Sequence, residues 1–286
     1  MKALLAFTLM CFSALNWAQP AHPLEGRLWA IESAEFITTE ALFERLPAGG
    51  WLLLGEQHDH PEHHRIQTRW ISALADRQQL GSVALEMADH SQQTHLDAAR
   101  GKGDRLTPEM LHWQEGWPWT LYGEVVSTAL NRAAAVAAAD LTRDEQRRFY
   151  REGAPQGELE DEHASFMRDL LYESHCGQMP RQALDGMRQV QLARDQRMAE
   201  VLRQYADDRR TGVMLTGGIH ARRDLGIPRW LHLPVISVLM IPADGSEAPT
   251  DYLPQGLPGH PVADYLLFTT ALPDKDYCAS FEEQPN

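Results

Sequence analysis

Two short motifs with the spacing Gly-x-x-His each follow an apolar run typical of a buried strand. One motif ends at His58 and the other ends at His220. Glu56 lies inside the first motif, and Glu86 follows another apolar run of the same kind. Imidazole and carboxylate groups serve in acid–base catalysis and also bind divalent metal ions. These four residues are therefore candidates for a catalytic site, for a divalent metal site, or for both.

The elements that must position these side chains are predicted from apolar runs bordered by Gly or Pro. The run 134–139 is compatible with a helix because it is rich in alanine, or with a strand because it ends in a polar segment. Pro61 opens a predicted helix over 61–78 between the first two strands, and a crossover of this length indicates a parallel sheet. We therefore expect an α/β fold with a mostly parallel sheet flanked by helices. The predicted strands are 51–54, 82–85, 212–215, 235–240 and 265–269.

In such a sheet, ligands bind outside the carboxyl ends of the strands. Glycine at the start of each motif is expected to let the chain turn tightly, so that the histidine points back over this edge. A competing interpretation is that polar groups at strand ends only cap the following helices. Further residues expected to line a pocket here are His60, His64, Asp140 and Arg222, although the two histidines are equally compatible with a solvent-facing helix start.

Two helical stretches interrupt the strand pattern, at about 91–132 and 141–210. We expect both to be inserted into the domain and to pack together as one helical subdomain. Tyrosine, histidine, methionine and cysteine are the side chains that bind haem iron. The two stretches carry Tyr122, Tyr150, Tyr172 and Tyr205, the four methionines at 167, 179, 187 and 198, and His175 with Cys176. The alternative is that these aromatic residues only pack in the helical core.

The first eighteen residues predict a signal peptide, because Lys2 precedes an apolar run over 3–15 and the small residue Ala18 offers a cleavage position. The remaining domain, 19–286, is then expected to be exported to the periplasm, with outer-membrane association through a lipid on Cys11 left open. In an oxidising compartment Cys176 and Cys278 could form a disulfide, or they could be two separate thiols.

The charge of the chain limits its partners. Its net charge is −14, which argues against nucleic acid as a partner because nucleic acids bind surfaces rich in Lys and Arg. Lysine occurs only at positions 2, 102 and 275, and no Gly-Lys-Ser/Thr phosphate loop is present.

Five segments of the sequence form a recognisable pattern: 54–67, 84–87, 174–180, 187–195 and 217–228. Together they resemble the ChaN-like haem-binding uptake family, which is grouped with Tiki-type and erythromycin-esterase-like proteins. The resemblance implies an α/β domain with a helical subdomain, export to the cell envelope, and haem held by a tyrosinate at a homodimer interface with a histidine nearby. On this basis Tyr150 and Tyr122 are the candidate haem ligands, and His175 is their candidate partner.

Three functional hypotheses follow. The first is a haem-binding envelope protein for iron acquisition that exchanges haem with an uptake receptor or transporter. The second is a metal-dependent hydrolase that uses Glu56, His58, Glu86 and His220, and the third is a scaffold that binds nothing. Because the tyrosines and the strand-end cluster lie in different parts of the chain, we expect haem binding to be independent of His58 and His220.

Overall fold

The computed structural model describes residues 22–273 and 275–279. The predicted signal peptide and Cys11 therefore lie outside the described residues. Within the described part of the chain, no helix combines the length and the apolar character needed to cross a membrane.

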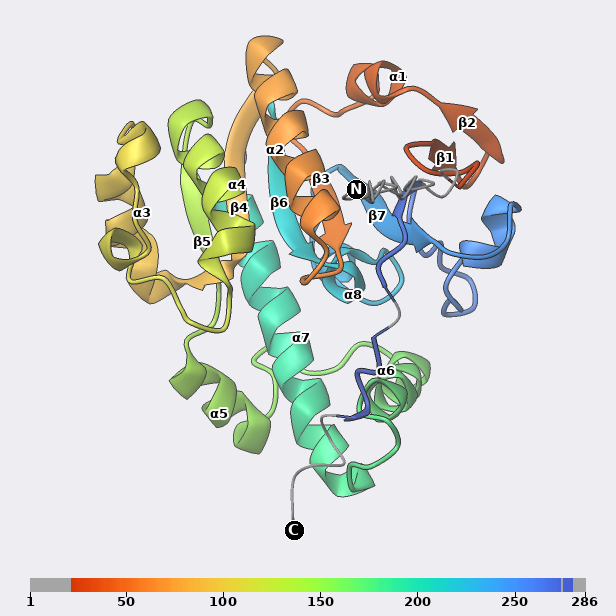
Figure 1. Cartoon of the computed structure of the whole chain (residues 1–286). Helices are drawn as coiled ribbons and strands as arrows, with labels where there is room; N and C mark the ends of the chain where they lie inside the picture. The colour runs from red at the N-terminus through yellow and green to blue at the C-terminus, as the bar shows by residue number, and fades with distance from the viewer. Residues whose placement is uncertain (1–21, 274, 280–286) are drawn as a thin grey trace, which may run out of the picture.

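A single eight-stranded sheet forms the centre of the molecule (Figure 1). Its strand order is β2-β1-β8-β7-β3-β6-β4-β5, and the six strands from β8 to β5 run parallel to one another. Only β1 and β2 are antiparallel additions at one side, so the predicted α/β class is confirmed. The strands are β1 (Leu28–Ala30), β2 (Glu35–Ile37), β3 (Trp51–Glu56), β4 (Leu80–Asp89), β5 (Val136–Asp140), β6 (Thr211–Gly217), β7 (Val235–Ala243) and β8 (Tyr265–Thr270).

All five predicted strands are present, and the ambiguous run 134–139 belongs to strand β5. Strands β3 and β6 in the middle are buried along their whole length, as expected for parallel strands covered on both faces. Strands β1 and β2 were not predicted. Each has only three residues, which is too short to show a periodicity in the sequence.

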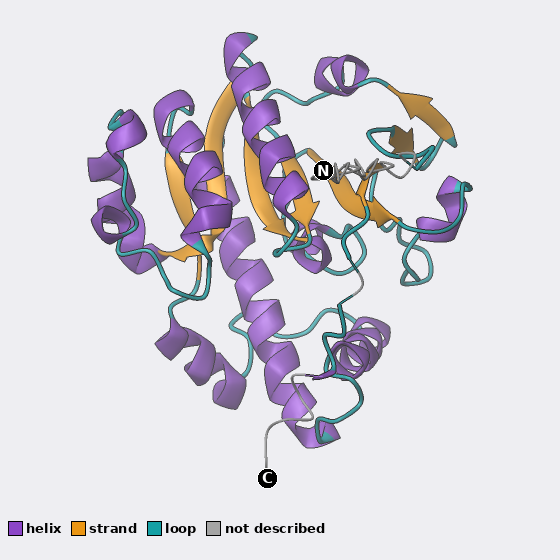
Figure 2. Cartoon of the chain, in the orientation of Figure 1, coloured by secondary structure: helices purple, strands orange, loops and turns teal. Residues whose placement is uncertain are grey.

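Helices cover both faces of the sheet (Figure 2). On one face α2 packs against α4, and the apolar stripe of α2 joins the larger core cluster. On the other face the C-terminal half of α7 packs on the strands, and the Trp51 indole N–H donates to the Leu202 carbonyl at 3.0 Å. The helices are α1 (Thr39–Glu44), α2 (Pro61–Asp76), α3 (Gln93–Ala99), α4 (Trp119–Arg132), α5 (Arg143–Glu152), α6 (Asp161–Ser174), α7 (Arg181–Gln204) and α8 (Gly218–Ala221). Five single-turn 3₁₀ helices are η1 (His90–Gln92), η2 (Gly103–Arg105), η3 (Glu109–Leu111), η4 (Ile227–Arg229) and η5 (Pro249–Tyr252).

The two inserted stretches do not form one subdomain, in contrast to the expectation. Helix α4 of the first stretch lies on the sheet beside α2, and α3 lies against β5. Helices α5 and α6 of the second stretch instead pack on α7, beyond the end of the sheet (Figure 1). The reason is the buried face of α4, where Val125, Val126 and Ala129 contact the core under α2.

A side chain pairs with the backbone of the outermost strand, β5. The Gln93 amide donates from Nε2 to the Val136 carbonyl at 2.9 Å, and its Oε1 accepts from the Ala138 N–H at 2.8 Å. Gln93 begins helix α3, so this pair of bonds fixes α3 beside β5.

Cys176 and Cys278 form a disulfide, with 5.8 Å between their Cα atoms. This pairing settles the alternative left open by the sequence. Cys176 lies just after α6 and Cys278 lies after β8, so the bond connects the C-terminal segment to the helical group of α5–α7.

Candidate functional site

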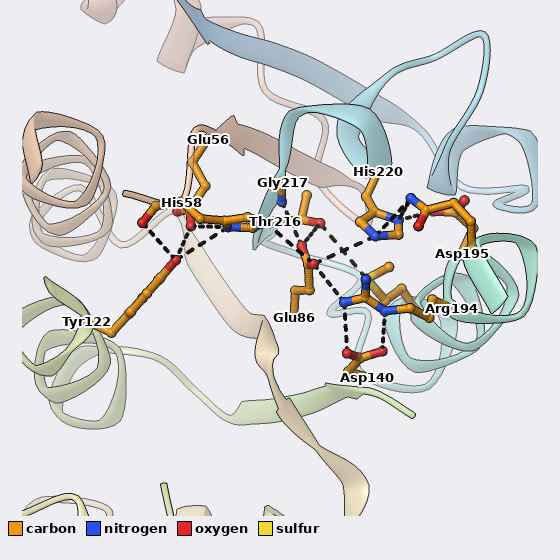
Figure 3. Close-up of polar contacts among 12 residues, drawn as sticks. Glu56, His58, Glu86, Tyr122, Asp140, Arg194, Asp195, Thr216, Gly217 and His220 are labelled. Atoms are coloured by element: carbon orange, nitrogen blue, oxygen red, sulfur yellow. Dashed lines mark hydrogen bonds and ion pairs between the residues drawn. The ribbon is translucent and has the colours of Figure 1, made fainter. Parts of the chain in front are cut away.

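The two Gly-x-x-His motifs lie side by side because their strands are neighbours. Strands β3 and β6 pair in a register that places Glu56 opposite Gly217, at the carboxyl ends of both strands. His58 and His220 follow these positions, and Glu86 lies in the adjacent strand β4. All four predicted residues line one pocket of about 540 Å³, so the structure brings them together as expected from the strand ends (Figure 3).

Glycine at position 217 is needed for close approach rather than for a turn. Its φ is −63°, which any residue can adopt, so the expected conformational role is wrong at this position. A Cβ atom at Gly217 would lie 2.8 Å from His58 Nε2. The missing side chain therefore makes room for the imidazole over the strand edge.

Buried Glu56 accepts hydrogen bonds from three elements. The Tyr122 hydroxyl of α4 donates at 2.6 Å, the Gln67 amide of α2 donates at 2.5 Å, and His58 Nδ1 lies at 2.9 Å. Burial and the neighbouring Glu56 carboxylate raise the pKa of Tyr122 well above its usual value. Tyr122 is fully buried and remains a phenol, so it does not fit the predicted role of tyrosinate ligand. The expected separation of this tyrosine from His58 is also wrong.

His58 presents one ring nitrogen to the pocket. Its Nδ1 donates to Glu56, and 41% of its side chain is exposed. Partial burial opposes the charged imidazole, but the hydrogen bond to Glu56 and the charge of Glu86 outweigh it and raise the pKa of His58. The remaining Nε2 lies 3.8 Å from Glu86 Oε1. This orientation suits a group that takes up a proton at Nε2.

Glu86 is held ionised at the centre of the site (Figure 3). Its Oε2 accepts from the Thr216 hydroxyl and the Gly217 N–H, both at 2.6 Å, and its Oε1 accepts from Arg194 Nη2 at 2.7 Å. Burial opposes ionisation, but the charges of His220 and Arg194 lower the pKa of Glu86 far below its usual value. Arg194 also binds both oxygens of Asp140, at 2.9 and 2.8 Å, and these two carboxylates raise its own pKa against the effect of burial.

His220 forms a second imidazole–carboxylate pair with Asp195 of α7. Its Nδ1 lies 2.6 Å from Asp195 Oδ1, and burial raises the pKa of Asp195 although His220 opposes this shift. Its Nε2 lies 3.1 Å from the Gln191 amide nitrogen. Nε2 also lies 3.7 Å from Glu86 Oε1, so both histidines point an Nε2 at the same carboxylate.

A divalent metal does not fit this arrangement. Among the described residues no group of three or more His, Cys, Asp or Glu side chains is arranged to hold a metal ion. Arg194 Nη2 lies 2.7 Å from Glu86 Oε1, the oxygen that both histidine Nε2 atoms face. The guanidinium therefore already neutralises the carboxylate that a cation would need. The predicted metal site at Glu56, His58, Glu86 and His220 is therefore not supported.

Only one of the four further residues expected to line the pocket does so. Arg222 lines it while paired with Asp224 at 2.6 Å. Asp140 lies behind Arg194, and His64 Nε2 is buried against the His58 carbonyl at 3.0 Å. His60 caps helix α2, with its Nε2 2.9 Å from the Thr270 carbonyl.

His63, on the same first turn of α2, is buried and does not line the pocket. Its ring stacks on His60 with 4.0 Å between centroids. Its Nδ1 accepts from the Gln57 N–H at 2.9 Å, so its Nε2 donates to the Thr269 hydroxyl at 3.1 Å. Burial and the neighbouring histidines lower the pKa of His63 to about 2. His63 is therefore neutral, and in this state it holds the loop that carries His58.

The other two candidate haem residues lie away from the pocket. Tyr150 is on α5 with 42% of its surface exposed, and its ring packs on Gly186 of α7. His175 ends helix α6, where its Nδ1 lies 2.7 Å from the Leu171 carbonyl. The structure does not bring Tyr150 and His175 into contact.

Sequence reasoning missed the contribution of α7 to the pocket. Gln191, Arg194 and Asp195 all come from this helix. The sequence contains one signal for this contribution, the position of Asp195. This residue shares a helical face with the apolar residues Met198 and Leu202, three and seven positions later. A charge on an apolar face requires a buried partner, which here is His220.

Comparisons with known proteins agree with this fold. The family model described as "Haem-binding uptake, Tiki superfamily, ChaN" matches residues 42–231. ChaN of Campylobacter jejuni, solved in a study of cofacial heme binding, aligns with a TM-score of 0.69 and 23% identity over 84% of this chain and 95% of that one. The erythromycin esterase mutant EreC, in its open conformation, aligns with a TM-score of 0.51 and 11% identity over 88% and 99%. A search of curated proteins found no significant match.

At 23% and 11% identity, the two solved structures show only that the fold is shared. The family model is stronger evidence, because it covers well over half of the sequence and includes both Gly-x-x-His motifs. The chain belongs to the haem-binding uptake family of the Tiki superfamily, the ChaN family.

Proposed function

We propose that this protein binds haem at the cell envelope and serves haem or iron acquisition, with Tyr150 as the iron ligand. Family membership supports the ligand class. The observation that carries the choice of Tyr150 is its exposure. Among the described residues it is one of two large hydrophobic side chains that are exposed, whereas Tyr122 is fully buried.

The surroundings of Tyr150 suit a planar dianionic ligand. A depression of about 380 Å³ beside it is lined by Val190 and three arginines, namely Arg143, Arg147 and Arg151. The arginines are spaced four residues apart on α5, so they form one row on the helix surface. These guanidinium groups would pair with the haem propionates, and the Tyr150 oxygen would supply an anionic iron ligand when haem is bound.

The proposed location is the periplasm after removal of the signal peptide, and association with the outer membrane is the alternative location. We also propose that a homodimer forms around bound haem and that an uptake receptor or transporter is its partner. The supports are the apolar N-terminal run, the disulfide expected of an oxidising compartment, and the open face of α5.

Titration with hemin tests the ligand. We expect a saturable absorbance change with a tyrosinate charge-transfer band in the wild-type protein. Tyr150→Phe should lose the band and bind at least about tenfold more weakly, a loss of about 1.4 kcal/mol. Tyr122→Phe is the matched control and should keep both band and affinity. An unchanged spectrum in Tyr150→Phe would rule out this ligand, and monomeric elution of the hemin-loaded protein would rule out the dimer.

A second candidate function is hydrolysis in the strand-end pocket without a metal. The specific observation is the pair of oriented histidines, His58 on Glu56 and His220 on Asp195. Apolar side chains of β7, including Leu239 and Ile241, line the same pocket, which suits an apolar acyl substrate.

In this reaction His58 Nε2 would take a proton from water as the water oxygen attacks the substrate carbonyl. The tetrahedral intermediate would then break its bond to the alcohol oxygen, which would leave with the proton from His58 Nε2, so that the acid is released and the histidine is neutral again. Glu56 holds the His58 Nδ1–H and so keeps Nε2 available as the base. Arg194 also lines the pocket and could stabilise the developing oxyanion with its positive charge.

Hydrolysis of p-nitrophenyl butyrate tests this second function. We expect His58→Gln to lower kcat/KM about 100-fold, or about 2.7 kcal/mol, because the general base is removed. A chelator should have no effect, and Tyr150→Phe should retain full activity because its ring lies on α5, outside this pocket. Equal rates for the wild-type protein and His58→Gln would exclude His58 as the base.

A further inference from the structure

A C-terminal segment connects the sheet to the helical group across the side of the pocket that carries His58. The chain leaves the sheet at the end of β8, and Cys278 then bonds to Cys176 between α6 and α7. In Figure 1 this segment, in dark blue, descends from the sheet towards the end of α6. We refer to residues 275–279 as the strap.

The strap contacts the two residues on either side of His58. Lys275 Nζ lies 2.9 Å from Asp59 Oδ2, and the Tyr277 hydroxyl donates to the same oxygen at 3.0 Å. The Tyr277 oxygen also accepts from the Gln57 amide at 2.9 Å. The strap is therefore hydrogen-bonded to the loop immediately before and after the histidine that faces the pocket.

These contacts are too exposed to hold a chain end by themselves. The Lys275 side chain is 60% exposed and Tyr277 is 49% exposed. Exposed ion pairs contribute little, and chain ends fray unless they are tied down. The disulfide keeps Lys275 and Tyr277 close to Asp59, which raises their effective concentration at the loop.

We propose that the strap positions the His58 loop only while the Cys176–Cys278 disulfide is intact, so that the redox state of this bond controls the geometry of the pocket. Lys275, Tyr277 and Asp59 are then positioning residues for His58. The proposal depends on neither haem binding nor hydrolysis, because it concerns the loop itself.

The switching step is thiol–disulfide exchange with a dithiol protein or reagent. A thiolate of the dithiol attacks one sulfur of the Cys176–Cys278 bond, which breaks, and the other cysteine leaves as a thiolate and takes up a proton. The second thiol of the reductant then displaces the first cysteine. The protein gains two electrons and ends with two thiols, while the dithiol is oxidised to its disulfide.

Hydrogen exchange of the oxidised and reduced protein tests the strap. We expect reduction with dithiothreitol to speed amide exchange at Gln57 and His60 several-fold, and to speed modification of His58 by diethyl pyrocarbonate. Exchange in β5 should not change, because that strand lies at the far side of the sheet. A uniform increase that includes β5 would mean that the disulfide only stabilises the whole fold, and would overturn the proposal.

Two variants complete the test. Cys278→Ser should behave like the reduced protein under all conditions. The double variant Lys275→Met/Tyr277→Phe removes all three strap contacts with Gln57 and Asp59 but leaves the disulfide, so it should also speed exchange of the loop, and reduction should then add nothing further. The exposed residue Asp244 gives the matched control Asp244→Ala, which should respond to reduction like the wild type. If Lys275→Met/Tyr277→Phe and reduction have additive effects, or if neither changes the loop, the proposed coupling does not exist.

Discussion

Replacing Arg194 with methionine is expected to lower the free energy of unfolding by about 3–5 kcal/mol, the usual cost of breaking a buried ion pair. Arg194 lies between Glu86 and Asp140, with exposed fractions of 1% and 9% for these carboxylates' side chains. Methionine fills similar volume but leaves both negative charges without their common partner. Thermal unfolding should show the loss as a decrease in Tm on the order of 10 °C.

The matched control for this variant is Arg147→Met, because Arg147 forms an ion pair with Asp144 on the surface of α5. An exposed pair contributes about 0–1 kcal/mol, so its loss should barely change Tm. Adding Asp140→Asn to Arg194→Met should recover part of the loss by removing one unpaired charge. Equal stability of Arg194→Met and Arg147→Met would show that the buried network carries no net stabilisation.

Acid is expected to destabilise the fold through His63 before the carboxylates titrate. The pKa of His63 is about 2 in the folded protein, against 6.5 for the unperturbed side chain. The unfolded chain therefore binds a proton below pH 6.5 that the folded chain rejects, and stability falls as pH decreases from 6.5 towards 2. At about 1.4 kcal/mol per pH unit, the expected loss between pH 7.5 and 4.5 is about 3 kcal/mol.

Urea unfolding at pH 7.5, 5.5 and 4.5 measures this loss. His63→Asn is the control, because its amide oxygen can still accept from the Gln57 N–H while the group no longer titrates. The raised pKa of His58 acts in the opposite direction, since protonation of that residue stabilises the folded state as pH falls. The difference between wild type and His63→Asn isolates the contribution of His63. Parallel pH profiles for the two proteins would contradict it.

The sequence predicted the parts of this molecule in which local pattern and tertiary environment agree. Buried parallel strands such as β3 and β6 contain apolar runs, so their positions could be predicted directly from the sequence. The polar residues that follow them had to gather at one edge, which brought His58 and His220 into one pocket.

The parts that could not be predicted depend on which elements pack over that edge. Tyr122 reaches Glu56 from 66 positions away because α4 lies beside α2, and Arg194 reaches Glu86 because α7 crosses the strand ends. No local periodicity encodes these distances. A site that resembles a metal centre in sequence is therefore an ion-pair network around Arg194 in the folded chain.

The pairing of Gln93 with β5 bears on how molecules of this protein meet one another. A terminal strand normally offers its free N–H and C=O groups to any extended peptide, which can add to the sheet and begin an aggregate. The Gln93 amide satisfies the Val136 carbonyl and the Ala138 N–H in the way that a neighbouring strand would. Strand addition at this side would first have to displace Gln93, so the sheet resists growth by β-augmentation where it would otherwise be most open to it.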